Sequence, residues 1–131
     1  GEAPVARPVI GADACPATRL HAMQWHFGFS PWHPKHLADH HSGGWKLHVA
    51  KAGRYRIELR RYPRRSDLAI GATEARLQIG TVDVTAALKI SQAAIQFEVE
   101  LEAGDTELKT SLTTPGQTKP FSAYFAYISR L

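Results

Sequence analysis

The sequence has few features that could cross-link a fold or anchor it in a membrane. It contains a single cysteine, Cys15, so no intramolecular disulfide can form. No apolar run approaches the length of a membrane span, and the first residues lack the basic-then-apolar order of a signal peptide. A chain of 131 residues can bury a core without such supports. Residues 1–8 contain Pro4 and Pro8 and show no period, so we expect them to be a leader or the end of a linker, and we expect residues 9–131 to form a single domain.

The common motifs of enzymes are also missing. There is no Gly-x-Ser-x-Gly motif, no glycine-rich phosphate loop, and no pair of carboxylates at an informative spacing. A lone cysteine such as Cys15, at the entrance of a predicted strand, is usually structural. We expect neither a catalytic residue nor a cofactor in this chain.

No segment has a helical period, and apolar residues instead alternate with polar ones. The clearest example is 53–63, where Tyr55, Ile57 and Leu59 alternate with charged side chains, as in a strand with one buried face. Neighbouring segments repeat this design, so we expect this strand to lie in the middle of a sheet whose other face is open to water.

The same alternation, interrupted by turn residues, predicts the other strands. They are expected at 9–10, 18–25, 45–49, 75–79, 82–84, 95–101, 106–112 and 123–130. Residues 80–81 are expected to turn a hairpin, and residues 114–120 to form a hairpin loop. About eight short strands with turns at this spacing predict an all-β, antiparallel two-sheet sandwich of the jelly-roll type.

Residues 26–44 form a long segment without any period, and they contain five histidines. Loops of this length are usually functional or disordered. His33, His36 and His40 are candidate metal ligands, because imidazole suits zinc, copper or nickel. The alternative is a solvated loop whose histidines form local hydrogen bonds, since Asp39 is the only carboxylate nearby.

Arginines gather on and after the strand at 53–63, and this basic set is a second candidate for ligand binding: Arg54, Arg56, Arg60, Arg61, Arg64 and Arg65. Arg54, Arg56 and Arg60 should share the outer face of this strand, where guanidinium groups match sulfate or carboxylate oxygens in pairs. The alternative is a solvated sheet face, whose charge is offset by Glu58 and by acids of neighbouring strands. The net charge of +4, before any histidine is protonated, favours acidic partners without choosing among them.

Aromatic side chains are a further candidate for ligand binding, because their faces stack on sugar rings. Trp45 is in phase with Leu47 and Val49, so we expect it in the core. Trp32 is the best exposed candidate, and the alternative is that it anchors its own loop. The full set of aromatic candidates comprises Trp25, Trp32, Trp45, Tyr62 and Tyr124.

Several segments together resemble the C-terminal β domain of many bacterial sulfatases, of the arylsulfatase and N-acetylgalactosamine-6-sulfatase type. The resemblance covers most of the chain and consists of strand and turn patterns. The segments are 45–63 (Trp-Lys-Leu-His-Val through Arg-Arg-Tyr-Pro), 75–80, 97–104 and 123–128, preceded by 31–44.

This resemblance implies a non-catalytic accessory domain that packs on or caps a catalytic sulfatase domain. The parent would hydrolyse sulfate esters with a formylglycine and a calcium ion, both in the catalytic domain, and would be periplasmic or secreted. The modification motif of that family is Cys or Ser, any residue, Pro, any residue, Arg. Here Pro16 follows Cys15 directly, so the motif fails although Arg19 is in place.

The alternative function is a carbohydrate-binding module for an anionic or sulfated glycan. Its ligand-binding residues would come from the arginine face and from nearby aromatic side chains, without nucleic acid as a partner. These predicted residues are Arg54, Arg56, Arg60, Trp32 and Tyr62.

Overall fold

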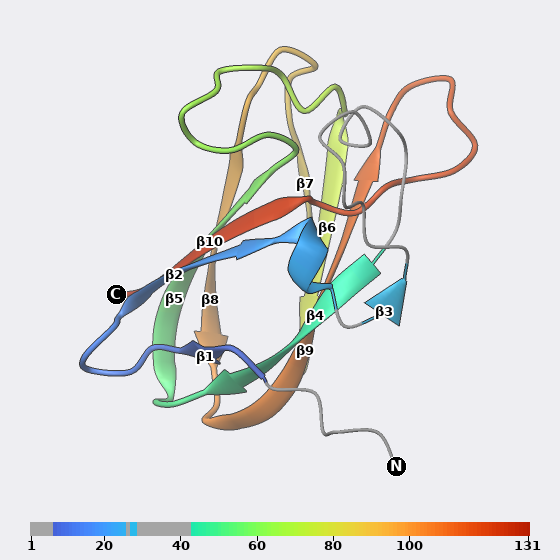
Figure 1. Ribbon diagram of the computed structural model, residues 1–131. Helices are drawn as coiled ribbons and strands as arrows, with labels where there is room; N and C mark the ends of the chain where they lie inside the picture. Colours follow the sequence, from blue (N-terminus) through green and yellow to red (C-terminus); the bar gives the residue numbers. More distant parts are fainter. Residues whose placement is uncertain (1–6, 26, 29–42) are drawn as a thin grey trace.

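Two β-sheets pack face to face in the computed structural model, which describes residues 7–25, 27–28 and 43–131 (Figure 1). The larger sheet has the strand order β1-β4-β9-β6-β7, with β3 paired to β4, and the smaller sheet has the order β2-β10-β5-β8. All strand pairs are antiparallel except β1 with β4. The predicted all-β sandwich is confirmed.

The strands follow the predicted alternation closely. They are β1 (Val9–Ile10), β2 (Ala17–His21), β3 (Phe27–Gly28), β4 (Gly43–Val49), β5 (Gly53–Arg60), β6 (Glu74–Ile79), β7 (Val82–Ala87), β8 (Ile95–Leu101), β9 (Gly104–Thr113) and β10 (Phe125–Arg130), with a short 3₁₀ helix η1 (Ala22–Gln24) after β2. Within the described residues, no helix is long and apolar enough to cross a membrane.

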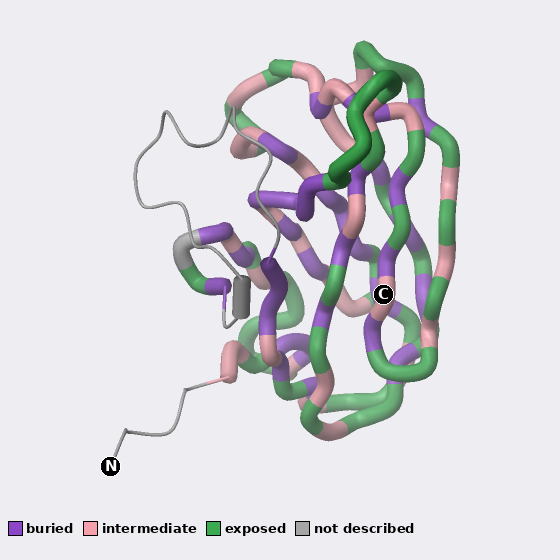
Figure 2. Tube along the Cα trace, turned by 90° about the vertical axis from the view of Figure 1, so that its right-hand side faces the viewer, coloured by how far each residue is buried: buried purple, intermediate pink, exposed green. Residues whose placement is uncertain are grey.

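The core lies between the two sheets, and Figure 2 shows buried and exposed positions alternating along the strands. Its largest fully buried side chains include Trp45, Tyr55, Phe121 and Tyr124. Trp45 also joins the sheets, because its indole Nε1 donates a 3.0 Å hydrogen bond to the carbonyl oxygen of His21. Full burial of an apolar side chain contributes about 1.5–3 kcal/mol each, so this layer is the main source of stability.

Strand β5 occupies the predicted central position. It pairs with β10 on one side and with β8 on the other. Tyr55, Ile57 and Leu59 are fully buried, whereas Arg54 and Arg56 are exposed. The outer face of the smaller sheet is therefore the polar face that the sequence pattern indicates.

Of two predictions about connections, one was wrong and the other is confirmed in part. The strand expected at 18–25 ends at His21, where the chain turns into η1 and Gln24 Oε1 accepts a hydrogen bond from the His21 N–H. Residues 114–120 do form a loop closed in an antiparallel manner, because Leu112 and Phe121 pair through backbone hydrogen bonds of 2.6 and 3.0 Å. The strand after this loop, β10, nevertheless lies in the smaller sheet, whereas β9 lies in the larger one, so the chain crosses between the sheets after Phe121.

Candidate functional site

The outer face of the smaller sheet brings together side chains from three strands. Phe125 on β10 lies opposite His21 on β2 and Arg60 on β5. Residues in register on neighbouring strands share a face, so these side chains point to the same side of the sheet.

The next outward row also has an aromatic residue at its centre. Tyr127 lies opposite Arg19 on one side and Glu58 on the other. The two rows place two half-exposed aromatic rings beside His21, Arg19 and Arg60, with the Glu58 carboxylate on the remaining side of Tyr127.

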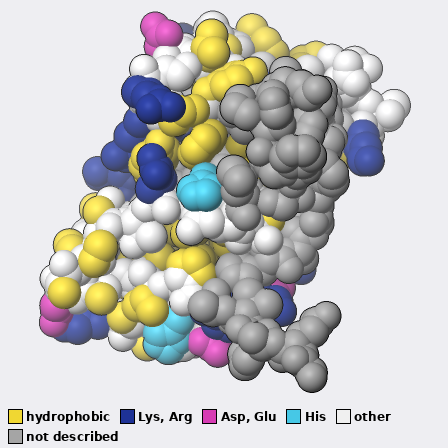
Figure 3. Space-filling model, viewed as in Figure 1, with side chains coloured by type: hydrophobic (Ala, Val, Ile, Leu, Met, Phe, Trp, Pro, Cys, Tyr) yellow, Lys and Arg dark blue, Asp and Glu magenta, His cyan; other side chains and the backbone are white. Residues whose placement is uncertain are grey.

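The connection after β5 folds over this face. The Arg64 guanidinium lies 4.3 Å from the centroid of the Tyr127 ring, and the Arg64 backbone N–H donates a 2.8 Å hydrogen bond to Tyr127 Oη. Between this segment and the sheet is an open hollow of about 450 Å³, which we call the β2–β10 hollow. Its lining residues are Arg19, His21, Pro63, Arg64, Arg65, Phe125 and Tyr127. On this face, Figure 3 shows yellow hydrophobic side chains beside dark blue basic ones and a cyan histidine.

Glu58 fixes the position of Arg64. This carboxylate is 5% exposed and accepts hydrogen bonds from Arg60 Nε (2.7 Å) and Arg64 Nε (2.9 Å). Gln96 Nε2 donates a third bond of 2.8 Å. Burial alone would raise the pKa of Glu58, but the hydrogen bonds from Arg64, Arg60 and Gln96 outweigh it and lower the pKa to about 2. The ionised Glu58 carboxylate thus holds Arg64, which lines the hollow, in place.

Two further arginines hold the rest of the connection against the body of the protein. Arg60 Nη1 donates to the carbonyl oxygen of Ser66, and Arg61 Nη1 donates to that of Ile70, each at 3.2 Å. The buried Arg61 guanidinium also lies 4.5 Å from the centre of the Phe121 ring. Much of the arginine-rich run therefore stabilises the loop.

The predicted arginine face exists, and each of its members meets a carboxylate. Arg54 and Arg56 both bind Glu98, with N–O distances of 2.7 and 3.2 Å, and Arg60 binds Glu58. Hydrogen bonds from Arg54 and then Arg56 hold the pKa of Glu98 below its usual value. Ligand binding by Arg54, Arg56 and Arg60 stays a prediction. Their surroundings are those of the alternative, in which nearby carboxylates offset the charge of the arginines.

Arg19 and Arg65 differ from these arginines. Both are exposed in the β2–β10 hollow, and no carboxylate of the described residues forms an ion pair with either. His21 lies beside Arg19, and its pKa is lowered by burial and by the positive charge of Arg19. Sequence reasoning missed this hollow, although Phe125 and Tyr127 alternate with the apolar Ala126 and Ile128 and so belong to the outer face.

The aromatic predictions have mixed outcomes. Trp45 is fully buried, as expected. The suggestion that Trp25 and Tyr124 are exposed was wrong, because their rings pack edge to face with centroids 5.5 Å apart, and both are buried. Tyr62 is half-buried beside the hollow without being among its lining residues. Trp32 lies outside the described residues.

The predicted metal ligands His33, His36 and His40 also lie outside the residues that the structure describes. In the part of the chain that is described, no three His, Cys, Asp or Glu side chains are grouped to hold a metal ion.

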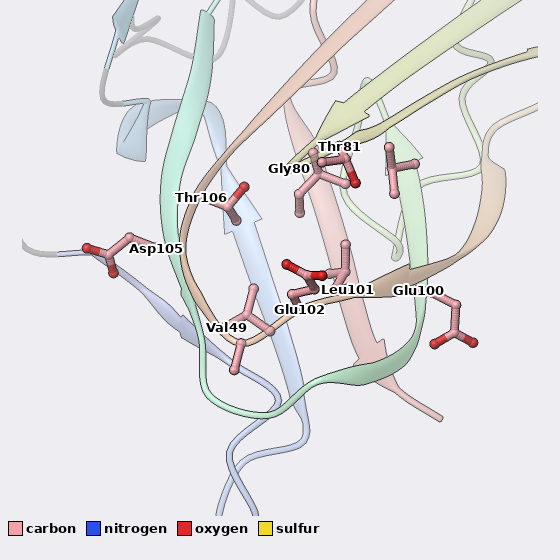
Figure 4. Close-up of a pocket in the computed structure, with 11 residues that line it drawn as sticks. Val49, Gly80, Thr81, Glu100, Leu101, Glu102, Asp105 and Thr106 are labelled. Carbon is pink, nitrogen blue, oxygen red and sulfur yellow. The ribbon is translucent and has the colours of Figure 1, made fainter.

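A second hollow, of about 140 Å³, lies at the other end of the strands. Its lining includes Glu100, Glu102 and Asp105 but no aromatic or basic side chain. Figure 4 shows the Glu100 and Asp105 carboxylates on opposite sides of the hollow, and Asp105 Oδ1 already pairs with His48 Nδ1 at 2.8 Å. This arrangement offers no surface on which a planar or ring-shaped ligand could stack.

Comparison with known proteins relates the fold to carbohydrate-active proteins. No family model and no curated protein sequence matches the chain. The structure is similar to CBM35, a family 35 carbohydrate-binding module, from Cellvibrio japonicus Abf62, with a TM-score of 0.53 and 18% identity over 86% of this chain and 91% of that one. It is also similar to part of a ruminal GH26 endo-β-1,4-mannanase, with a TM-score of 0.57 and 10% identity over 87% of this chain. The chain spans 26% of the length of that mannanase.

These similarities correct the assignment to sulfatases. The two structures described above, to which the fold is similar, are a carbohydrate-binding module and a glycoside hydrolase rather than sulfatase domains. The accessory role in a sulfatase is therefore wrong as well. Alternating strands and hairpin turns occur in antiparallel sandwiches of many families. The matching segments therefore predicted the correct fold but not the correct family.

Proposed function

We propose that this chain is a carbohydrate-binding module of a larger, extracellular glycoside hydrolase, and that the glycan binds in the β2–β10 hollow. The observation that carries the proposal is the pair of half-exposed rings, Phe125 and Tyr127, held on an open sheet face among hydrogen-bond donors. The similarity of the fold to a carbohydrate-binding module and to a portion of a mannanase supports it.

The chemistry of the hollow suits a sugar ring. The C–H face of a pyranose packs on aromatic carbon, while its hydroxyl groups need donors and acceptors at the edge of the ring. Phe125 and the part of the Tyr127 ring that the Arg64 guanidinium leaves uncovered supply the apolar surface, and Arg64 and His21 supply polar groups beside it. Because Glu58 and Tyr127 hold Arg64 in place, little side-chain freedom is lost when the ligand binds.

The proposal is tested by measuring the affinity of the full chain for a panel of soluble glycans that begins with β-1,4-mannan. We expect Phe125→Ala and Tyr127→Ala each to weaken binding by about tenfold or more, the effect of losing about 1.4 kcal/mol of stacking. Tyr127→Phe, which keeps the ring, should retain most of the affinity. Tyr62→Ala serves as the matched control, because Tyr62 is an aromatic residue outside the hollow.

Two results would overturn the proposal. One is that no glycan of the panel binds to the folded wild-type chain. The other is that a glycan binds equally well to the wild type and to both alanine variants, which would place the binding site elsewhere.

A further inference from the structure

We propose that the ligand of the β2–β10 hollow is an acidic sugar, and that Arg19 and Arg65 bind its carboxylate or sulfate group while the ring packs on Phe125 and Tyr127. This inference rests on the proposed function and names the class of glycan. Arg65 belongs to the basic set found in the sequence, whereas Arg19 was not a predicted ligand-binding residue.

The first argument is the charge of the lining. The hollow contains three arginines and one histidine but no acidic residue. Of these arginines, Arg64 is neutralised by the buried carboxylate of Glu58. Arg19 and Arg65 have no such partner among the described residues, so two guanidinium groups face one hollow with their charges uncompensated.

The second argument is the contrast with the other arginines. Elsewhere in the described part of the chain each arginine has a local partner, and six of these arginines form an ion pair with a carboxylate. The ion pairs are Arg7–Asp105, Arg54–Glu98, Arg56–Glu98, Arg60–Glu58, Arg76–Asp83 and Arg130–Asp13. Arg61 donates to the Ile70 carbonyl and packs on the Phe121 ring. The uncompensated pair is thus confined to the candidate site.

The third argument is the match between donor and acceptor. A guanidinium group presents a fixed fork of N–H donors that binds two oxygens of a carboxylate or sulfate at once. Two like charges in one hollow repel each other, and an anion between them would remove that repulsion. A neutral sugar gains the stacking but not this pairing. We therefore expect acidic sugars to bind at least about tenfold more tightly than neutral sugars of the same linkage.

The test is calorimetric titration of the full chain with three oligosaccharides: an oligogalacturonate, a sulfated galactan fragment and an uncharged galactan fragment. Titrations are run at low salt and at about 0.15 M salt, where the Debye length is about 8 Å. The double variant Arg19→Gln, Arg65→Gln is compared with Lys119→Gln, which removes an exposed charge outside the hollow.

We expect preference for an acidic ligand, weakened by salt, lost in the double variant and kept in Lys119→Gln. The carboxylate and sulfate arms then tell which anion is preferred. Equal binding of the neutral fragment, with loss on Tyr127→Ala, would overturn this inference and leave the proposed function standing. Absence of binding to every glycan would overturn both, and preference for acidic ligands that survives the double variant would overturn the role of these arginines.

Discussion

Glu58 is a carboxylate buried on the outer face of a sheet, where a solvated side chain would be ordinary. Its three hydrogen-bond donors come from β5, from the connection after β5, and from β8. Removing such a buried charge leaves its arginine partners uncompensated, so Glu58→Gln should destabilise the fold by about 2–3 kcal/mol at neutral pH. Urea unfolding measures this, and Glu98→Gln, at an exposed ion pair, should change stability little.

The low pKa of Glu58 also gives stability a specific dependence on pH. The folded-state pKa of about 2 lies below the ordinary value of 4.5, so the contribution is complete above pH 4.5 and is lost as the pH falls toward 2. The wild type should therefore lose stability over this window, and Glu58→Gln should lose less. Equal acid sensitivity of the two proteins would show that Glu58 is not ionised in a strong pair.

His21 gives the hollow a second pH dependence, which concerns binding. Burial and Arg19 lower its pKa, so His21 is neutral at pH 7, and a bound anion would raise that pKa again. The charged groups that face it are Arg19, Arg64 and Arg65, with Tyr127 beside them. We expect affinity for an acidic sugar to rise from about pH 7.5 to about pH 5.5 in the wild type but not in His21→Gln. The carboxylate of the sugar stays ionised throughout this range, so a rise in both proteins would assign the effect to another group.

The residues of the site could be predicted only in part. Alternation within one strand correctly placed Arg54, Arg56 and Arg60 on one outer face. The carboxylate partner of the first two is Glu98, and finding it required knowing that β8 neighbours β5. Arg19 and Tyr127 come from opposite ends of the chain and meet only through the pairing of β2 with β10, which no local pattern specifies.

At the scale of elements, the turn between β1 and β2 depends on a glycine. Gly11 has φ of +75°, and a Cβ atom there would overlap the ring and hydroxyl group of Tyr55. Tyr55 is fully buried, and its Oη donates a 2.6 Å hydrogen bond to the Lys51 carbonyl, so it cannot move aside. Gly11→Ala should therefore cost about 2–4 kcal/mol of stability.

Gly116 is the matched control for this substitution. Its φ of +80° is similar, but it lies in an exposed loop, and no atom is within 4 Å of the position that an alanine Cβ would take. Gly116→Ala should cost only about 1 kcal/mol, the conformational part of the effect. Thermal or urea unfolding of both variants separates the conformational cost of the alanine from its steric overlap with Tyr55. An equal loss of stability in the two variants would contradict the steric role of Tyr55.

The positions of the strands were easier to predict than the neighbouring strands with which they pair. The period-two pattern located β5, β8 and the β6–β7 hairpin because each buries one face within a few consecutive residues. It did not show that the chain changes sheets between β9 and β10, since an inward-facing side chain looks the same in either sheet. The sequence alone also gave no reason for β2 to end at His21, where η1 begins.

At the scale of the whole molecule, the fold and the family proved to be separate questions. A sandwich with one buried and one solvated face per sheet satisfies the alternation of this chain, and many unrelated families meet the same requirement. The two ends of the sandwich differ, however, because one hollow is lined by acids and the other by bases and aromatic rings. The proposed function therefore rests on the β2–β10 hollow rather than on the strand pattern.

The most direct test of this account is to map where a glycan binds. The full chain, labelled with ¹⁵N, is titrated with an oligosaccharide that binds in the affinity panel, and its backbone amide shifts are followed by NMR. We predict that the largest changes fall at Arg19, His21, Arg64, Phe125 and Tyr127. Changes confined to the acidic hollow around Glu102, or to residues away from the smaller sheet, would contradict it.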